Sequence, residues 1–220
     1  MAGLFISFEG IDGSGKSTQA KLCFDALVQK SIPSLLTREP GGEVIAEKIR
    51  EILLYSQDEV LPQTEVLLYA AARSQHVRKV IEPALAEDKI VICDRFVHSS
   101  IAYQGYGLGV DQESIWQINR FAMGNIFPDI VFLFDLSVDA AQQRSQERAQ
   151  SRESLVNSEK SKRDRIEARS FEFYQKVRNG FLEMAKDPRV KILDATKTPE
   201  AIHDEVISIV CQVYQGGRNQ

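Results

Sequence analysis

A glycine-rich segment near the amino terminus carries the clearest chemistry in the sequence. Residues 10–17 read GIDGSGKS, which matches the pattern G-x-x-x-x-G-K-S. In this pattern successive backbone N–H groups form a concave site for phosphate at the positive end of the following helix, and glycines let the phosphate approach closely. We expect Lys16 to reach the β- and γ-phosphates of a nucleotide and the Ser17 hydroxyl to bind Mg²⁺. The segment therefore predicts a site for nucleotide phosphates.

A pair of charged residues, Asp94 and Arg95, follows a run that is typical of a buried strand. Residues 90–93 read IVIC, a continuous apolar run of the kind that parallel strands show. Ligands of open α/β sheets bind at the carboxyl ends of the strands. We expect Asp94 to organise Mg²⁺ and Arg95 to hold a phosphate, unless they serve only an internal salt bridge. Asp135, which closes the apolar run 130–134, is a rival for the metal role.

Further polar side chains stand where a nucleoside could be recognised. Arg38 ends a short apolar run before a Glu-Pro-Gly-Gly turn. Tyr69 and Arg73 are four residues apart, so a helix would present both on one face. The segment 99–105 (SSIAYQG) offers two hydroxyls, a ring and an amide. Simpler explanations remain open, because Arg38 would also suit a solvated turn, and Tyr69 and Arg73 a core aromatic residue beside a surface charge.

The stretch 144–169 is polar and basic. It holds 8 basic and 5 acidic side chains, a net charge of +3. Such a stretch is often a plain solvated loop. Beside a phosphate site it has a second interpretation, because bringing two phosphate groups together crowds negative charge that a mobile, arginine-bearing lid neutralises while it excludes water. We favour the lid.

Strand and helix patterns alternate along the whole chain, which predicts an α/β fold with a parallel sheet covered on both faces and right-handed crossovers. No second domain boundary is visible, so residues 1–220 form one predicted domain. Pro83 should kink or break the helix that precedes it. The predicted strands are 4–8, 34–38, 90–93, 130–134 and 190–193; the predicted helices follow the glycine-rich loop, cover 43–54, 63–81 and 112–123, and begin near 138, 166 and 199.

Composition limits the range of partners. The net charge of −4 argues against a general binder of nucleic acid or membrane surfaces. No apolar run reaches the roughly 18 residues of a membrane span, and the amino terminus lacks the features of a signal peptide. The three cysteines lie far apart in apolar surroundings without a C-x-x-C pair, which predicts buried free thiols in a reducing cytoplasm. The three histidines lack metal-ligand spacing. We expect a cytoplasmic protein without a zinc or iron site.

Three classes of phosphate-binding protein compete for this pattern. A GTPase switch should carry an N/T-K-x-D motif, and the nearest sequence, residues 196–199 (TKTP), lacks the aspartate. A mechanochemical ATPase is usually larger and carries an inter-subunit signature. A small-molecule kinase needs a phosphate loop, an acceptor pocket and a lid, and this chain has candidates for all three.

Five segments resemble bacterial thymidylate kinases: FEGIDGSGKST at 8–18, TREPGG at 37–42, YAAAR at 69–73, DRF at 94–96 and AYQG at 102–105. The resemblance extends from about residue 4 to residue 196. It implies a three-layer P-loop kinase fold with a five-stranded parallel sheet and a mobile lid. It also implies Mg²⁺-dependent transfer of the γ-phosphoryl group of ATP to dTMP, giving dTDP and ADP for dTTP synthesis, and a homodimer.

The resemblance also implies roles for individual residues. Asp12 would lie near the sugar 3′-OH of dTMP, Tyr69 would stack on thymine, Arg73 would donate to its O4, and Tyr103 would crowd the 2′ position. Arg38 and Arg95 would hold the acceptor phosphate. The implied substrate-binding set is Asp12, Arg38, Pro40, Tyr69, Arg73, Arg95, Ser99, Ser100, Tyr103 and Gln104. The implied ATP-binding set is Gly10, Gly13, Ser14, Gly15, Lys16, Ser17, Thr18, Arg144 and Thr196, with Ser17 and Asp94 on the metal and Lys16, Asp94, Arg95 and Arg148 catalytic.

Departures from the family pattern concern the lid and one aromatic position. Some members carry an arginine at the position of Gly13, so glycine here implies that the lid supplies it, with Arg148 as first choice and Arg152 as second. Residues 153–162 resemble an insertion in the lid. Phe96 stands where the family often has Tyr or His. The alternatives left open are a kinase acting on dUMP, UMP or CMP, and a non-enzymatic protein gated by nucleotide.

Overall fold

Five strands form one parallel sheet in the computed structural model, which describes residues 3–153 and 165–216, with the side chains of 148–149 and 151–153 left aside. The strands are β1 (Leu4–Glu9), β2 (Ser34–Arg38), β3 (Ile90–Asp94), β4 (Ile130–Asp135) and β5 (Val190–Asp194). They pair in the order β2-β3-β1-β4-β5, and every pair is parallel. The predicted five-stranded parallel sheet is confirmed.

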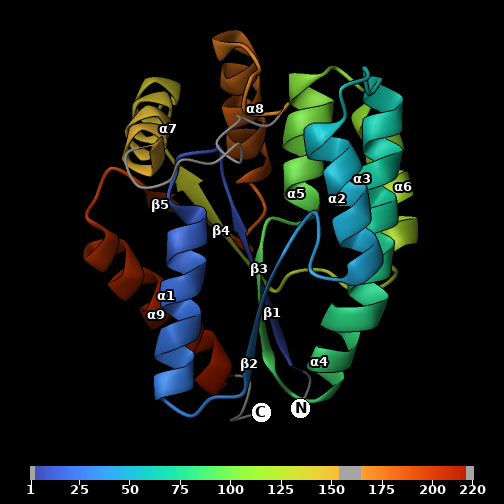
Figure 1. Ribbon diagram of the computed structural model, residues 1–220. Helices are drawn as coiled ribbons and strands as arrows, with labels where there is room; N and C mark the ends of the chain where they lie inside the picture. Colours follow the sequence, from blue (N-terminus) through green and yellow to red (C-terminus); the bar gives the residue numbers. More distant parts are fainter. Residues whose placement is uncertain (1–2, 154–164, 217–220) are drawn as a thin grey trace.

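Helices cover both faces of this sheet. Figure 1 shows α1 and α9 on one side, α2 to α6 on the other, and α7 and α8 above the end at which the strands finish. The helical elements are α1 (Lys16–Gln29), α2 (Val44–Tyr55), α3 (Pro62–His76), η1 (Val77–Ile81), α4 (Glu82–Ala86), α5 (Val97–Ser100), η2 (Ile101–Gly107), α6 (Gln112–Met123), α7 (Val138–Glu153), α8 (Phe171–Met184) and α9 (Pro199–Gly216).

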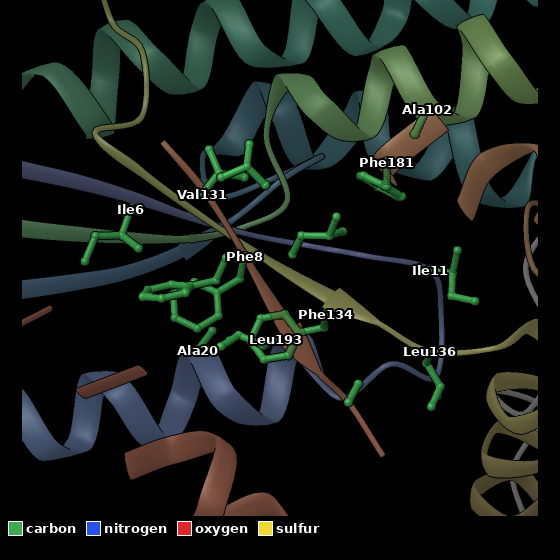
Figure 2. Close-up of a cluster of buried hydrophobic side chains, with 14 of the residues drawn as sticks. Ile6, Phe8, Ile11, Ala20, Ala102, Val131, Phe134, Leu136, Phe181 and Leu193 are labelled. Atoms are coloured by element: carbon green, nitrogen blue, oxygen red, sulfur yellow. The ribbon is translucent and has the colours of Figure 1, made fainter. Parts of the chain in front are cut away.

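The continuous apolar strands are explained by burial on both faces. Successive side chains of a strand point to opposite faces. In β1, Phe5 packs with one cluster of buried side chains and Ile6 with the other, and in β3 Val91 and Ile92 divide in the same way. Figure 2 shows the larger cluster, in which Phe8 lies among side chains of β4, β5 and α1. Both faces of the sheet therefore need apolar residues, which leaves polar ones for the strand ends.

The register of the central strands brings three polar segments together. Asp94 at the end of β3 is level with Phe8 of β1 on one side and with Arg38 of β2 on the other. The glycine-rich loop after β1 and the turn after β2 therefore begin beside Asp94. This register, set by the buried apolar residues of the strands, positions the site.

Three local details differ from the sequence-based prediction. The break expected at Pro83 occurs one turn earlier, where Val77–Ile81 forms a π-helical turn between α3 and α4. Proline has no N–H and its ring crowds the carbonyl four residues before it, which disrupts regular α-helical bonding at that turn. Residues 97–107, which carried no helix prediction, are helical throughout as α5 and η2. The helix expected from 166 begins at Phe171, after a turn.

Candidate functional site

The glycine-rich loop joins β1 to α1 as the sequence predicts. Lys16 is the first residue of α1 and is almost fully buried. Its ammonium group lies 3.4 Å from the carbonyl oxygen of Ile11 and 3.5 Å from Asp12. Burial lowers the pKa of Lys16, and the nearby charge of Arg95 lowers it further, while Asp12 and Asp94 oppose this shift. A phosphate entering the loop would relieve this unfavourable burial of charge.

Gly13 cannot be replaced without strain. Its φ of +84° favours glycine, and a Cβ there would collide with the carbonyl oxygen of Ala141 in α7. We expect Gly13→Ala to lower the free energy of unfolding by about 2–3 kcal/mol in urea titrations. Gly109→Ala is the matched control, because Gly109 also has positive φ, +75°, but faces open space. An equal loss in both variants would contradict a steric role of α7. The collision also explains why an arginine at position 13 would not fit this chain.

Asp12 lies between two cations. Its carboxylate pairs with Arg95 and Lys16, and it accepts an O–H hydrogen bond from Tyr103 at 3.0 Å. Burial alone would raise the pKa of Asp12, but the charges of Arg95 and Lys16 lower it well below the usual range. Asp12 is therefore an ionised carboxylate within the glycine-rich loop.

Arg95 is held by both its backbone and its guanidinium group. Its φ is +72°, a conformation that costs an L-residue free energy and that occurs often at functional sites. The guanidinium donates to the carbonyl oxygen of Gly10 at 3.1 Å, to Ser99 Oγ at 3.2 Å and to Tyr103 Oη at 3.2 Å, besides Asp12. Arg95 thus pairs with Asp12 and not with its neighbour Asp94.

Glu9, which the sequence analysis did not select, braces the turn that contains Arg95. This fully buried carboxylate at the end of β1 accepts from Phe96 N at 2.8 Å and from Ser99 Oγ at 2.6 Å. Burial raises the pKa of Glu9 to about 7, against the opposing effects of Ser99 and Arg95. The sequence gives no signal that Glu9 supports this turn, because its partners Phe96 and Ser99 lie 87 and 90 positions away in the chain.

Asp94 and Asp135, the two rivals for the metal role, have different surroundings. Asp135 forms a two-pronged ion pair with Arg178 of α8, at 2.7 and 3.0 Å. Asp94 Oδ1 is buried without a hydrogen-bond partner among the described residues. Asp94 and Ser17 both line the cavity that also contains Lys16. Oxygen ligands in small number beside a phosphate site fit Mg²⁺, which keeps waters and phosphate oxygens as its other ligands. These two residues therefore fit a magnesium ion, and Asp135 does not.

Arg73 is the largest fully buried side chain with a charge, so the alternative of a surface charge is wrong. It donates to Glu39 at 2.8 Å and to Ser100 Oγ at 3.1 Å, and it also donates to Asn119 Oδ1. Its guanidinium carbon lies 5.2 Å from the centre of the Phe96 ring. Phe96, a substitution to which the sequence assigned no weight, thus supports Arg73. Arg73 is a preset hydrogen-bond donor at the wall of the cavity.

Arg38 and Arg50 add positive charge at the same edge. Arg38 and Arg50 each donate to the carbonyl oxygen of Pro40, at 3.1 and 2.8 Å, and Arg38 also pairs with Glu47 at 3.0 Å. Burial and the nearby charge of Arg38 lower the pKa of Arg50. Arg50 escaped the sequence analysis because it stands inside a predicted helix without a motif. Arg38 pairs with a carboxylate, whereas Arg50 donates to a carbonyl oxygen. The positive charge of the two guanidinium groups suits an anionic ligand.

One cavity at the carboxyl edge of the sheet collects the predicted residues. Every predicted substrate-binding residue lines it, together with Lys16, Ser17 and Asp94. Glu39, Arg50, Leu54, Phe96, Ile166 and Glu167, which the sequence analysis did not select, line it too. The complete lining is Asp12, Lys16, Ser17, Arg38, Glu39, Pro40, Arg50, Leu54, Tyr69, Arg73, Asp94, Arg95, Phe96, Ser99, Ser100, Tyr103, Gln104, Ile166 and Glu167.

Other predicted residues lie outside this cavity. The residues that belong to the loop and the first turn of α1 without lining the cavity are Gly10, Gly13, Ser14, Gly15 and Thr18. Arg144 belongs to α7, which contacts the loop at Gly13, and exposed Thr196 donates to Asp194 at 2.6 Å in the turn before α9. The side chains of Arg148 and Arg152 and the apparent insertion fall outside what the structure describes, apart from the backbone of α7.

Three remaining expectations concern cysteines, metals and membranes. Cys23, Cys93 and Cys211 are free thiols; the first two are buried as predicted, and Cys211 is half-buried. Within residues 3–153 and 165–216 no group of three or more His, Cys, Asp or Glu side chains is arranged to hold a metal ion. No helix of the described chain combines the length and apolarity that crossing a membrane requires.

Comparisons with known proteins converge on one family. The family model described as thymidylate kinase matches residues 8–206. A thymidylate kinase of Pelotomaculum thermopropionicum is 46% identical over 216 residues, which cover 97% of this chain and 95% of that protein. One of an Exiguobacterium species is 43% identical and covers 99% of this chain and 98% of its own. The crystal structure of thymidylate kinase from Ehrlichia chaffeensis superposes with a TM-score of 0.72 at 34% identity, covering 96% of this chain and 99% of that one.

Proposed function

The chain belongs to the thymidylate kinase family of phosphotransferases, whose members convert dTMP to dTDP with ATP as phosphate donor. We propose that this chain catalyses the reaction with Mg²⁺ and acts as a homodimer. The proposal is carried by the convergence of the predicted acceptor-binding residues on a cavity that Lys16 and Asp94 also line. Donor and acceptor phosphates would meet at that point, at the carboxyl edge of the sheet.

The acceptor phosphate is assigned to Arg95 and Arg38, with Arg50 as an addition from the structure. All three guanidinium groups line the cavity. No general base is required, because a phosphomonoester with a second pKa near 6 is already largely a dianionic nucleophile at neutral pH. Catalysis then consists of aligning two phosphate groups and neutralising their charge. This requirement accounts for a site rich in arginine.

The nucleoside of the acceptor is assigned to the opposite wall. Tyr69 would stack on thymine and Arg73 would donate to its O4, with Ser100 and Gln104 as further contacts to the base. Support comes from the rigid hydrogen bonding of Arg73, which leaves its position independent of any ligand. Tyr103 would exclude a 2′-hydroxyl, and its own hydroxyl is fixed by Asp12 at 3.0 Å. Asp12 would then lie near the sugar 3′-OH.

The donor nucleotide is assigned to the glycine-rich loop. The loop amides and Lys16 would hold its phosphates, Ser17 and Asp94 would hold Mg²⁺, and Arg144 and Thr196 would border the adenine. Bound Mg²⁺ would supply charge neutralisation between the phosphates. Because position 13 is a glycine and not an arginine, we assign the contact with the transferred phosphoryl group to an arginine of the lid. Arg148 is our first choice and Arg152 our second.

The homodimer is assigned to a face formed by α2, α3 and α6, which Figure 1 shows next to one another. We call the exposed apolar residues of these three helices the apolar face; they are Val44, Ile45, Ile52, Tyr55, Leu67 and Phe121. Phe121 is 90% exposed, and exposed apolar residues that gather in a patch are typical of surfaces that bind another protein.

Charge on the apolar face should dissociate this dimer. We expect Leu67→Glu and Phe121→Glu each to shift the sedimentation coefficient from that of a dimer to that of a monomer, because an unpaired carboxylate would be buried in the interface. Val28→Glu is the control, since Val28 is 52% exposed on α1, away from this face. A monomeric wild-type protein, or dimers in both face variants, would reject the assignment.

The activity is tested by ADP release with Mg·ATP and a panel of dTMP, dUMP, UMP, CMP and AMP. We expect turnover to be led by dTMP. Turnover led by another monophosphate would keep the kinase but overturn the roles of Arg73 and Tyr103. Binding of ATP without turnover on any acceptor would favour a nucleotide-gated binding protein.

The proposed location of the protein is the cytoplasm. The free thiols support it, because thiols stay reduced in that compartment.

A further inference from the structure

A buried carboxylate, Glu65, reaches the substrate cavity only through another side chain. Glu65 lies in α3, is fully buried and is not among the described residues that line the cavity. Its Oε1 accepts from Gln104 Nε2 at 2.8 Å, and its Oε2 accepts from Arg165 and Arg169, each at 2.7 Å. Glu65 therefore acts as an acceptor towards all three partners.

This arrangement fixes the orientation of the Gln104 amide. A glutamine amide has a donor end and an acceptor end that point in different directions, and its orientation follows from its partners. Since Glu65 accepts, the Nε2 end faces it. Gln104 Oε1 is buried and has no hydrogen-bond partner in the part of the chain that the structure describes, although Gln104 lines the cavity. The polar group left for a ligand is thus an acceptor.

We propose that Glu65 is a positioning residue for base selectivity, because it makes Gln104 present an acceptor and not a donor to the base. The inference rests on the proposed function in that the ligand is a nucleoside monophosphate whose base reaches Gln104. Thymine and uracil carry an N–H at ring position 3 and can donate to this oxygen. Cytosine has an unprotonated nitrogen there, so two acceptors would face each other.

Two arginines hold the carboxylate that faces the amide. Arg165 also donates to the carbonyl oxygen of Leu53, at 3.0 and 3.1 Å, and Arg169 stacks on Phe173, with its guanidinium carbon 4.6 Å from the ring centre. Both hold Glu65 Oε2, so the carboxylate stays in place. A turned Gln104 would bring its oxygen against Glu65 in a buried site, which is strongly unfavourable. The mismatch with cytosine therefore cannot be relieved by turning Gln104 without a large cost in free energy.

The test measures dissociation constants of dTMP and dCMP by calorimetry for wild type, Glu65→Gln, Gln104→Met and the double variant. We expect Glu65→Gln to reduce the preference for dTMP at least about tenfold, because an amide at 65 can accept or donate and lets Gln104 turn. Gln104→Met should reduce it similarly, and the double variant should show no further loss, since one residue acts through the other. An unchanged preference in Glu65→Gln, or reductions that multiply in the double variant, would overturn the proposal.

Controls separate this role from support of the fold. Arg165→Lys and Arg169→Lys alter the other half of the cluster and should leave the preference within about threefold. If Glu65→Gln does not fold, Glu65→Asp keeps the charge for the arginines but withdraws from Gln104, and it must still reduce the preference at least about threefold. Wild-type turnover of dTMP with an unchanged preference in these variants rejects this inference alone, whereas absent wild-type turnover rejects the proposed function.

Discussion

Replacing Arg95 by alanine should lower kcat/KM for dTMP by about two orders of magnitude, equivalent to about 2.7 kcal/mol of transition-state stabilisation. The guanidinium lines the cavity, and four hydrogen-bond acceptors hold it in place. Its loss would remove charge-assisted hydrogen bonds to the acceptor phosphate. Alanine takes the same positive φ as arginine with no greater strain, so backbone effects largely cancel. Steady-state kinetics with varied dTMP would measure the loss.

Two controls define what the Arg95 result means. Arg95→Lys keeps the charge without the planar fork and should recover only part of the lost activity. Arg78→Ala removes an exposed guanidinium that pairs with Glu82 at 2.7 Å and should leave kcat/KM within about twofold. If Arg95→Ala retained kcat/KM within threefold of wild type, the placement of the acceptor phosphate would be wrong.

Replacing Asp94 by asparagine should raise the Mg²⁺ concentration for half-maximal activity at least about tenfold and lower kcat about a hundredfold. The variant keeps the shape of the side chain but removes the charge from a buried oxygen that has no hydrogen-bond partner within the described residues. Such an oxygen is suited to the metal and its waters. A Mg²⁺ titration at saturating ATP and dTMP would separate the metal requirement from kcat.

Asp135→Asn is the matched comparison for Asp94→Asn. Both residues close apolar strands of the same sheet, but Asp135 is engaged with Arg178. Its variant should leave the Mg²⁺ requirement within about twofold of wild type. An unchanged Mg²⁺ requirement in Asp94→Asn, or a raised one in Asp135→Asn, would contradict the assignment of the metal to Asp94.

The sequence predicted the sheet and the location of the site because both depend on local patterns. Continuous apolar runs are required for strands buried on both faces, and their parallel register then brings Arg38, Asp94 and the glycine-rich loop to one edge. The cavity that forms there contains all the predicted acceptor-binding residues. Motif spacing therefore sufficed to identify the residues around the ligand.

The partners of these residues could not be predicted, because they are distant in the chain. Arg95 meets Asp12 across 83 positions, and Glu65 meets Arg165 and Arg169 across 100 and 104. Helical spacing placed Tyr69 and Arg73 on one face but could not tell that Arg73 would be buried and donate hydrogen bonds to Glu39 and Asn119. Such pairings follow from tertiary packing, which no local pattern records.

Asp12 gives the pocket an anion of its own. Its carboxylate pairs with both Arg95 and Lys16, the two cations that phosphates require, and offsets one of their two positive charges. A small anion must therefore compete for these cations with a tethered group at high effective concentration. A nucleotide adds the binding free energy of its base and sugar and can displace the internal competitor. The carboxylate that we assign to the neighbourhood of the sugar thus makes the pocket a poorer receptor for free inorganic anions than for a nucleotide.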